Sequence, residues 1–366
     1  MGYAAVKGGE EAIECAEKIL RYQRLKGGAR PLTVKQIEEQ LYLAVDRVMG
    51  EGSLYAPELA ALAIKQAAGD TMEASFILRA YRTTKPRFGC SIPETTKEMR
   101  IARRISAAFK DVPGGQILGA TSDYTLKLLD FDLKDESPQV IKTFIRDISN
   151  ISKKGNIPDT FPKVAEILRK EGLLVERKGS ADLPVSDITR ESMIFPASRS
   201  ATLQAMARGE TGGLLLLAYS NMRGYGDIHP TIGELRVGFM PLKIIHPHTG
   251  EPYTVGEVKV TEAEVIARLD AEGETPKFTL GYGLCFGHNE VKAISMAVLD
   301  RAMQTKEPEM PSENQEFVLS HIDGIESTGF CSHYKLPHYV TFQSDLDRLR
   351  KVKEIHDIEG SLKKNL

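Results

Sequence analysis

The chain has 366 residues, of which 42% are hydrophobic and 27% charged, and its net charge at pH 7 is −2. This length exceeds one ordinary core, so we expect two or three lobes. The near-neutral charge argues against a protein whose main role is to coat nucleic acid. The longest apolar run, residues 214–219, is far shorter than the ~20 residues of a membrane helix, and the N-terminus lacks the apolar segment of a signal peptide. We therefore expect a cytoplasmic protein without nucleic-acid or membrane contacts.

The first third of the chain predicts a helical lobe. Apolar residues recur at helical spacing within five segments, residues 10–24, 33–48, 56–68, 71–81 and 97–109. Thr33 with Gln36 three residues later has the pattern of a capping box, and Pro57 suits a first helical turn. After a glycine turn, a short β-prone segment runs through Asp130. We therefore expect a helical N-terminal lobe over residues 1–131 that ends in a short β segment.

The rest of the chain changes character twice. Residues 132–195 combine polar helices and turns, and we expect an irregular or partner-contacting connector there. Beyond it, strand-like and helical runs mix. Strands are expected at 213–219, 234–245 and 278–286, and helices at 290–303, 315–324 and 342–355. The predicted fold class is α+β, a helical N-terminal lobe with a mixed α+β C-terminal lobe over residues 196–366.

The four cysteines are too far apart for a cofactor motif. The closest two, Cys285 and Cys331, are separated by 331 − 285 = 46 positions. This spacing excludes a CxxC metal site and the three-cysteine run of an iron–sulfur enzyme. We therefore expect free thiols and no iron–sulfur cluster in this chain.

Residues 331–339 contain the sharpest local motif, with His333 and His338 five positions apart. Five residues turn a helix by about 140° beyond a full turn, so the two side chains cannot share one helical face. Pro337 also moves the preceding residue out of the helical region, which predicts a loop or extended turn. Such a loop can bring both imidazoles to one zinc ion. Two ordinary loop histidines are the alternative, and a zinc site would need further ligands from Cys331, other histidines, a substrate or another chain.

A glycine-rich segment, GYGLCFG at 281–287, runs from a predicted strand into the helix expected from Glu290. Glycines in this position let backbone N–H groups approach phosphate. The spacing is GxGxxxG, which is one residue longer than the dinucleotide fingerprint. Close backbone packing at a strand end is the alternative explanation.

A polar segment between Arg223 and Arg236 combines glycines, an aromatic residue, a histidine and carboxylates. Loops on a rigid scaffold often carry such mixed sets. Glu234 or Asp227 can act as acid, base or cation stabiliser, His229 can donate a proton, and the two arginines can hold phosphate. A solvated hairpin with surface ion pairs is the alternative.

Two basic groups are further candidates for phosphate binding. One contains Arg79, Arg82, Lys85 and Arg87, and the other contains Arg100, Arg103, Arg104 and Lys110. The second group continues into Asp111 and a glycine turn, an arrangement suited to a polyphosphate. Solvated charged faces are the alternative for both groups.

Taken together, these segments resemble one known family over nearly the whole chain. The strings that carry the resemblance are LAVDRVMGEG (43–52), LRAYRTT (78–84), KDVPGGQILG (110–119), SRSATLQAMARGETG (198–212), AYSNMRGYG…HPTIGELRVG (218–238), GYGLCFGHNEVKAISMAVLDRAM (281–303) and EFVLSHIDGIESTGFCSHYKLPHYVTFQ (316–343). They are similar to subunit I of the bacterial carbon–phosphorus lyase system, the phosphonate metabolism protein PhnI family. Strings this long are far more specific than the short motifs above.

The resemblance implies an enzyme that acts on ATP and an alkylphosphonate. Alone, such a subunit acts as a nucleosidase that releases adenine from ATP, or guanine from GTP, and leaves ribose 5-triphosphate. With partner subunits G, H and L it replaces adenine at C1′ with methylphosphonate, and the product is α-D-ribose 1-methylphosphonate 5-triphosphate. Radical cleavage of the C–P bond belongs to subunit J, which carries the iron–sulfur cluster.

The resemblance also implies where this chain meets its partners. The metal-binding pair of the family matches His333 and His338, which would hold zinc at the interface with subunit J. Cys331 is not among the ligands of the family. The expected assembly contains subunits G, H and J, with K and L, and two copies of this chain in a two-fold symmetric core.

Displacement of a purine from C1′ passes through a cationic sugar, so it needs a carboxylate beside the sugar, an acid for the base and cations for the triphosphate. Our carboxylate candidates are Glu234 first and Asp111 second, and His229 is the candidate acid. The candidate phosphate ligands are Arg82, Lys110, Arg223 and Arg236. The alternative function is a mainly structural subunit that lends zinc ligands to subunit J.

Overall fold

A computed structural model describes residues 9–151, 158, 161–175, 185–223, 229–269 and 276–364. By its contacts the chain forms two compact units, one of Thr33–Asp323 and one of Met1–Leu32 with Gly324–Leu366. The sequence predicts three parts with boundaries at residues 131 and 195, and this division stays a prediction. No helix among the described residues is long and apolar enough to cross a membrane.

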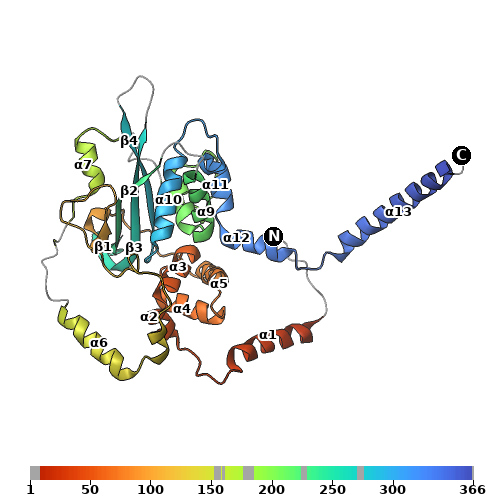
Figure 1. The fold of residues 1–366 in the computed structure, drawn as a ribbon, viewed down its shortest axis with the longest axis horizontal. Coiled ribbons are helices and arrows are strands. Elements are labelled where there is room, and N and C mark those ends of the chain that lie inside the picture. The colour runs from red at the N-terminus through yellow and green to blue at the C-terminus, as the bar shows by residue number, and fades with distance from the viewer. Residues whose placement is uncertain are drawn as a thin grey trace. The chain divides into compact units, whose positions relative to one another are not determined.

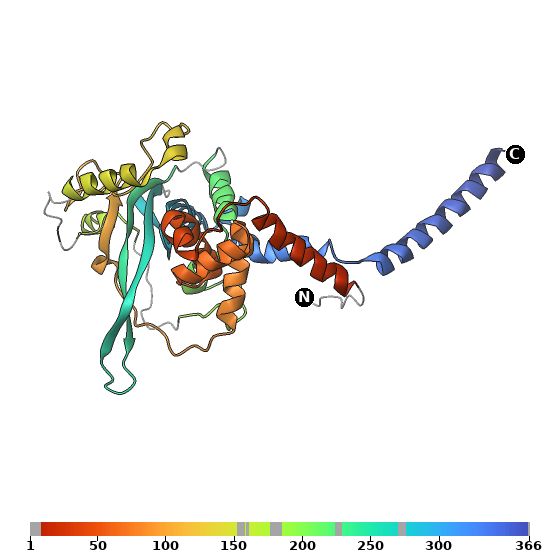
Figure 2. The same ribbon diagram turned by 90° about the horizontal axis from the view of Figure 1, so that it is seen from below.

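A four-stranded antiparallel sheet forms the centre of the larger unit (Figure 1). Its strands follow chain order, β1 (Arg100–Ile105), β2 (Thr231–Ile245), β3 (Pro252–Leu269) and β4 (Lys277–Phe286). The register places Glu234 of β2 opposite Glu264 of β3, and Glu264 opposite Tyr282 of β4. β2 and β3 form a long hairpin whose turn extends away from the helices (Figure 2).

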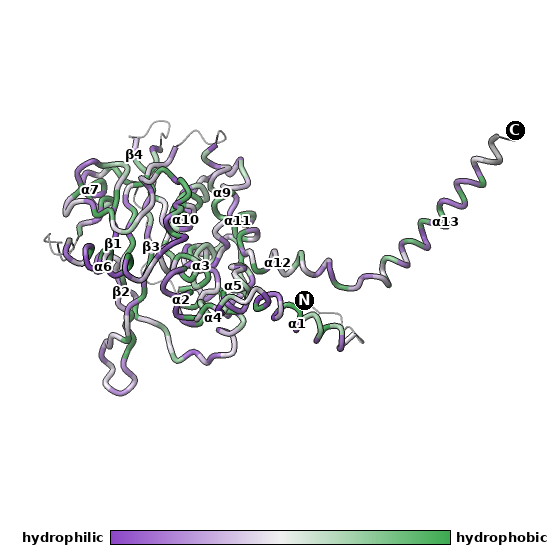
Figure 3. The backbone as a smooth tube through the Cα atoms, turned by 60° about the horizontal axis from the view of Figure 1, so that its bottom comes forward, coloured by the Kyte–Doolittle hydropathy of each residue, from purple (hydrophilic) through white to green (hydrophobic). Residues whose placement is uncertain are grey.

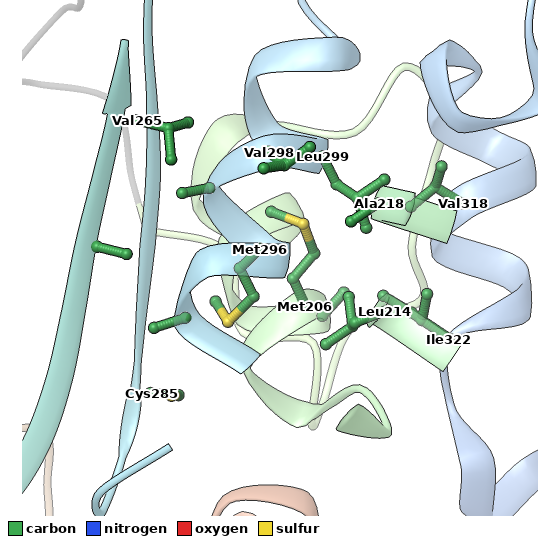
Figure 4. Close-up of a cluster of buried hydrophobic side chains, with 14 of the residues drawn as sticks. Met206, Leu214, Ala218, Val265, Cys285, Met296, Val298, Leu299, Val318 and Ile322 are labelled. Atoms are coloured by element: carbon green, nitrogen blue, oxygen red, sulfur yellow. The ribbon is translucent and has the colours of Figure 1, made fainter. Parts of the chain in front are cut away.

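Helices cover one face of the sheet and form the main core with it. They are α8 (Arg199–Arg208), α9 (Thr211–Met222), α10 (Glu290–Ala302) and α11 (Gln315–His321). α10 packs directly on β3 and β4, and Met296 and Leu299 are fully buried between the layers (Figure 4). This close packing requires glycine on β4, because a Cβ at Gly281 or Gly283 would lie 2.0 or 2.1 Å from a carbonyl oxygen of α10.

A second apolar cluster joins the four N-terminal helices. They are α2 (Val34–Gln40), α3 (Tyr42–Gly52), α4 (Pro57–Gln66) and α5 (Thr71–Thr83). The capping box of Thr33 and Gln36 and the first-turn position of Pro57 are confirmed. α3 also contacts α8 and β4, so these helices pack against the sheet layer within one unit.

Two helices lie outside these clusters. α7 (Val164–Lys170) packs on the sheet beside β2, on the face opposite α10 (Figure 1). α6 (Pro138–Ile151) has exposed apolar side chains, and its tube in Figure 3 alternates between hydrophilic and hydrophobic residues. These apolar side chains are Val140, Ile141, Phe144, Ile145 and Ile148. Short 3₁₀ turns occur at Thr96–Glu98, Phe131–Asp135 and Pro311–Glu313.

The smaller unit contains α1 (Glu10–Leu25), α12 (Gly324–His333) and α13 (Tyr339–Lys364). None of the side chains described in these helices is buried. α13 exposes large apolar residues along its length, among them Phe342, Leu349 and Ile355.

The α+β class is confirmed, with a helical N-terminal part and a sheet formed mainly by the C-terminal part. The strands expected at 234–245 and 278–286 and the helix at 290–303 are also confirmed within a few residues. The helix expected at 342–355 lies within the longer α13 (Tyr339–Lys364). Of the short β-prone segment that was expected before Asp130, only an isolated bridge from Ile117 to Arg104 forms.

Four other expectations were wrong. Within residues 97–109, Arg100–Ile105 form strand β1 and no fifth helix forms, because pairing with β2 outweighs helix propensity. Residues 213–219 belong to α9, since a short apolar run fits a buried helix as well as a strand. The helix expected over 33–48 is interrupted at Leu41, whose φ of −112° and ψ of 35° separate α2 from α3. The helix expected over 315–324 ends at His321.

Candidate functional site

A cavity of about 540 Å³ lies at the start of α10, within the larger unit. Its wall comes from the start of α3, the segment 120–123, the start of α9 and residues 288–292. The lining residues used below are Tyr42, Leu43, Arg47, Thr121, Ser122, Asp123, Thr211, His288, Glu290 and Lys292. Cavities of this size are typical of small-molecule sites.

The loop between β4 and α10 is fixed to α3. Gly287 has a φ of +74°, and a Cβ there would lie 2.4 Å from the Cβ of Asp46. The Asp46 carboxylate accepts a hydrogen bond of 2.9 Å from the backbone N–H of His288. The Asn289 side chain donates to the carbonyl groups of Asp46 and Phe286. These contacts set the position of the His288 side chain at the cavity wall.

His288 forms a hydrogen-bonded pair with Glu290, with 2.7 Å between Nε2 and Oε1. The same Glu290 oxygen lies 2.6 Å from Nε of Arg103, whose guanidinium also pairs with Asp123. Burial alone raises the pKa of Glu290, but the His288 hydrogen bond and the Arg103 charge lower it below its usual value. An ionised carboxylate that orients an imidazole is an arrangement suited to proton transfer.

Two buried polar atoms, one on Lys292 of the cavity wall and one on Glu51 of α3, have no hydrogen-bond partner among the described residues. Lys292 is 1% exposed, and its Nζ has no hydrogen-bond partner. Glu51 is 2% exposed, and its Oε2 atom is also without a partner, while Oε1 accepts from Thr211 and Arg47. Burial lowers the pKa of Lys292. Buried polar groups are nearly always hydrogen-bonded, so two such atoms together indicate a site for a ligand or water.

A second cavity, of about 240 Å³, is lined by Arg82, Arg208 and the polar side chains of Ser53, Thr189 and Gln204. Burial and the like charges of Arg208 and its neighbour Arg87 lower the pKa of Arg82. Two guanidinium groups in one small cavity attract an anion. The expected phosphate-binding role of Arg82 is compatible with this position and stays a prediction.

The sheet face under α7 carries a cluster of buried charges. Lys163 Nζ lies 2.8 Å from Glu262 Oε1 and 2.5 Å from Glu264 Oε1, and Arg236 pairs with the other Glu262 oxygen. Burial alone raises the pKa of Glu262, but the charges of Arg236 and Lys163 outweigh it and lower the pKa to about 2. Burial raises the pKa of Glu264, and Lys163 only partly opposes this. The Tyr282 hydroxyl also bonds to Glu262, at 3.0 Å.

Glu234 is held by an ion pair and a backbone hydrogen bond within the fold. The Glu234 carboxylate pairs with Nε of Arg104 and accepts 3.1 Å from the backbone N–H of Val164. Arg104 also donates to the carbonyl oxygens of Pro113 and Pro162. Arg236 is likewise 1% exposed and bound to Glu262. Neither Glu234 nor Arg236 lines either cavity, and their catalytic and phosphate-binding roles stay predictions.

The other sequence candidates lie elsewhere on the unit. Asp111, Lys110 and His229 are exposed and line neither cavity. Arg223 donates 2.7 Å to the Tyr219 hydroxyl at the end of α9. Asp227 lies outside the described residues. The structure therefore does not gather the predicted catalytic set at one place among the described residues.

In the smaller unit, the two histidines of the predicted metal pair meet. His333 ends α12, the chain turns at residues 334–338, and the Nε2 atoms of His333 and His338 lie 3.0 Å apart. Nδ1 of His338 bonds to the carbonyl oxygen of Leu336 at 2.6 Å, which turns Nε2 toward Nε2 of His333, where a metal would bind both. Two nitrogens of one tetrahedral zinc ion are roughly 3.3 Å apart, so the pair fits zinc. Among the described residues, no further His, Cys, Asp or Glu completes a set of three.

Sequence reasoning missed the residues around the first cavity. Three polar residues follow the glycine-rich segment at every second position, His288, Glu290 and Lys292. The glycine spacing was interpreted as the only functional feature of this segment. Arg103 is a candidate phosphate ligand by sequence, but in the structure it is 1% exposed and paired with Glu290 and Asp123. The only signal for the cavity was this His-x-Glu-x-Lys pattern at the start of a helix.

The fold and the cavity define an α+β protein with a small-molecule-sized site lined by the starts of α3, α9 and α10 and by the segment 120–123. Residues 2–356 match the family model described as bacterial phosphonate metabolism protein (PhnI), and the chain belongs to this family. HtxH, a protein of Stutzerimonas stutzeri whose name places it with C-P lyase subunits, is 56% identical over 97% of this chain and 96% of its own length.

Two further relatives share the name alpha-D-ribose 1-methylphosphonate 5-triphosphate synthase subunit PhnI. The protein from Rhizobium meliloti is 47% identical over 97% of this chain and 96% of its own. The protein from Escherichia coli is 46% identical over 96% of this chain and 98% of its own.

Proposed function

We propose that this chain is a subunit of a carbon–phosphorus lyase system that displaces adenine from ATP with methylphosphonate. The product is α-D-ribose 1-methylphosphonate 5-triphosphate. Alone, the chain acts as a purine nucleotide nucleosidase that releases adenine or guanine and leaves ribose 5-triphosphate. The observation that supports this most is the 46–47% identity, over nearly full length, to two relatives named as subunits of that synthase.

The geometry of the larger unit supports the same chemistry. A sugar cation at C1′ needs a nearby carboxylate, the departing base needs a proton, and the triphosphate needs cations. The larger cavity combines two carboxylates, Glu290 and Asp123, with His288, Arg47 and Lys292. The site is therefore equipped for a reaction that separates a base from an anionic sugar.

The smaller unit supports a role in an assembly. We propose that His333 and His338 hold zinc at the interface with subunit J, which would supply the missing ligands. The other proposed partners are subunits G, H, K and L, with two copies of this chain in the core. The exposed apolar faces of α6 and α13 suit contacts with such partners, because exposed faces of this kind mark interaction surfaces.

Adenine release is the test of this function. The purified chain is incubated with ATP, and free adenine and ribose 5-triphosphate are measured by chromatography. With subunits G, H and L and methylphosphonate, phosphorus NMR should detect a new phosphonate ester of ribose. If neither the chain alone nor the mixture releases adenine, the nucleosidase proposal is wrong and the structural-subunit alternative takes its place.

A further inference from the structure

We propose that the cavity at the start of α10 binds the purine nucleoside triphosphate and that His288 protonates the departing base there. This inference rests on the proposed function, since it assigns that reaction to a place. It differs from the sequence expectation, which put the acid at His229 and the carboxylate at Glu234.

The first reason is the unpartnered ammonium group of Lys292. Lys292 is one of the residues that line the cavity, it is 1% exposed, and the charged or titratable groups around it on other elements are Arg47 and Glu51 of α3, Arg79 of α5 and Cys285 of β4. A buried charge without a hydrogen-bond partner destabilises the fold unless a partner binds it. An anionic ligand supplies that partner, while Arg47 on the same wall is already paired with Glu51 and Glu210.

The remaining wall matches the other parts of a nucleotide. Tyr42 and Leu43 are half-exposed side chains that can contact the flat face of a base. The hydroxyl groups of Thr121, Ser122 and Thr211 can bond to ribose or phosphate oxygens. Sites for small ligands combine apolar surface with a few convergent polar groups in this way.

The reaction then follows from the acid–base pair. The C1′–N9 bond breaks with its electron pair on the purine, and the His288 imidazolium gives a proton to the purine. Glu290 stays ionised and orients the imidazole through their 2.7 Å hydrogen bond. A water oxygen bonds to C1′ and loses its proton to Asp123, so that water is divided between ribose and base. When methylphosphonate attacks, its anionic oxygen forms the bond and no proton is lost.

Binding tests the site separately from catalysis. The probe is a carbocyclic ATP analogue, in which CH₂ replaces the ribose ring oxygen and prevents cleavage. We expect Lys292→Met to bind it at least tenfold more weakly, a loss of about 1.4 kcal/mol, with an unchanged or higher Tm because Lys292 Nζ has no hydrogen-bond partner among the described residues. Lys243→Met, which removes a charge paired with Glu94 and Glu98, is the matched control.

A second variant guards against a folding defect. Tyr42 is 40% exposed, so Tyr42→Ala leaves the core intact and should also weaken binding of the analogue. If Lys292→Met and Tyr42→Ala both bind it as tightly as the natural chain, the cavity is not the nucleotide site.

Catalysis tests the role of His288. We expect His288→Asn to slow adenine release by about 10²–10⁴-fold while binding of the analogue changes by less than threefold. His248→Asn, at an exposed position in the turn between β2 and β3, is the control and should release adenine at the natural rate. Equal rates in His288→Asn and the natural chain would overturn its role and leave the proposed function standing. Absence of adenine from the natural chain would instead remove the proposed function, while the binding measurements would still decide the site.

Discussion

Arg104 and Glu234 form an ion pair in which each side chain is 1% exposed. Arg104 connects strand β1 to the segments around residues 113 and 162 through three carbonyl oxygens. Removal of one partner from such a pair leaves a buried charge without compensation. The pair therefore has a structural role whatever else Glu234 does.

We expect Glu234→Ala to lower the free energy of unfolding by about 3–5 kcal/mol. The reason is that Arg104 loses its counter-charge and the Val164 N–H loses its acceptor. Urea denaturation followed by circular dichroism measures the change. Glu257→Ala, whose ion pair with Arg100 is exposed, serves as the control and should cost less than about 1 kcal/mol. A loss of adenine release without a loss of stability would favour the catalytic role expected from the sequence.

Glu262 and Glu264 both pair with Lys163, but replacing each with neutral glutamine should change the stability of the fold in opposite directions. The pKa of Glu262 is about 2 in the folded chain, below its unfolded value of about 4.3. Ionised Glu262 therefore stabilises the fold fully above pH ~4.3, and this stabilisation is lost as the pH falls toward 2. The pKa of Glu264 is raised, so its ionised form opposes folding at neutral pH. We expect Glu262→Gln to destabilise the fold at pH 7 and Glu264→Gln to leave stability unchanged or higher.

Unfolding measured between pH 7 and pH 2 checks both signs. The natural chain should lose stability below about pH 4.3, and Glu262→Gln should show a flatter acid limb because that carboxylate no longer titrates. Equal effects of the two substitutions at pH 7 would contradict the assignment of the cluster's negative charge to Glu262.

Gly283 should be intolerant of any side chain, because a Cβ there would lie 2.1 Å from the carbonyl oxygen of Ala293 in α10. We expect Gly283→Ala to cost about 1–3 kcal/mol or more, since α10 must move away from β4. Gly256→Ala, at a position on β3 with no atom within 4 Å, should change stability by less than about 0.5 kcal/mol. Thermal unfolding distinguishes the two. A harmless Gly283→Ala would leave the phosphate-binding explanation of this segment open.

The limits of sequence reasoning follow from buried charge. Apolar periodicity located α10 and β4, and the turn chemistry of Thr33 and Pro57 was correct. Strand β3 was missed because Glu262 and Glu264 make it look polar, although tertiary ion pairs bury both. No local pattern in the sequence shows that the side chains of residues 163 and 236 form ion pairs with these two glutamates. For the same reason, the sequence did not predict that Arg103 is buried beside the cavity.

The pair of His333 and His338 gives the last prediction. Two imidazoles supply half of a tetrahedral zinc shell, and no third ligand joins them among the described residues. We expect the isolated chain to hold zinc weakly and the complex with subunit J to hold it tightly, as measured by dialysis and elemental analysis. His333→Ala and His338→Ala should each lower zinc retention in the complex by at least tenfold. His356→Ala, an exposed histidine on α13 of the same unit, should have no effect. Stoichiometric zinc at equal affinity in the isolated chain would contradict the interface model, because a complete site would then exist within this chain.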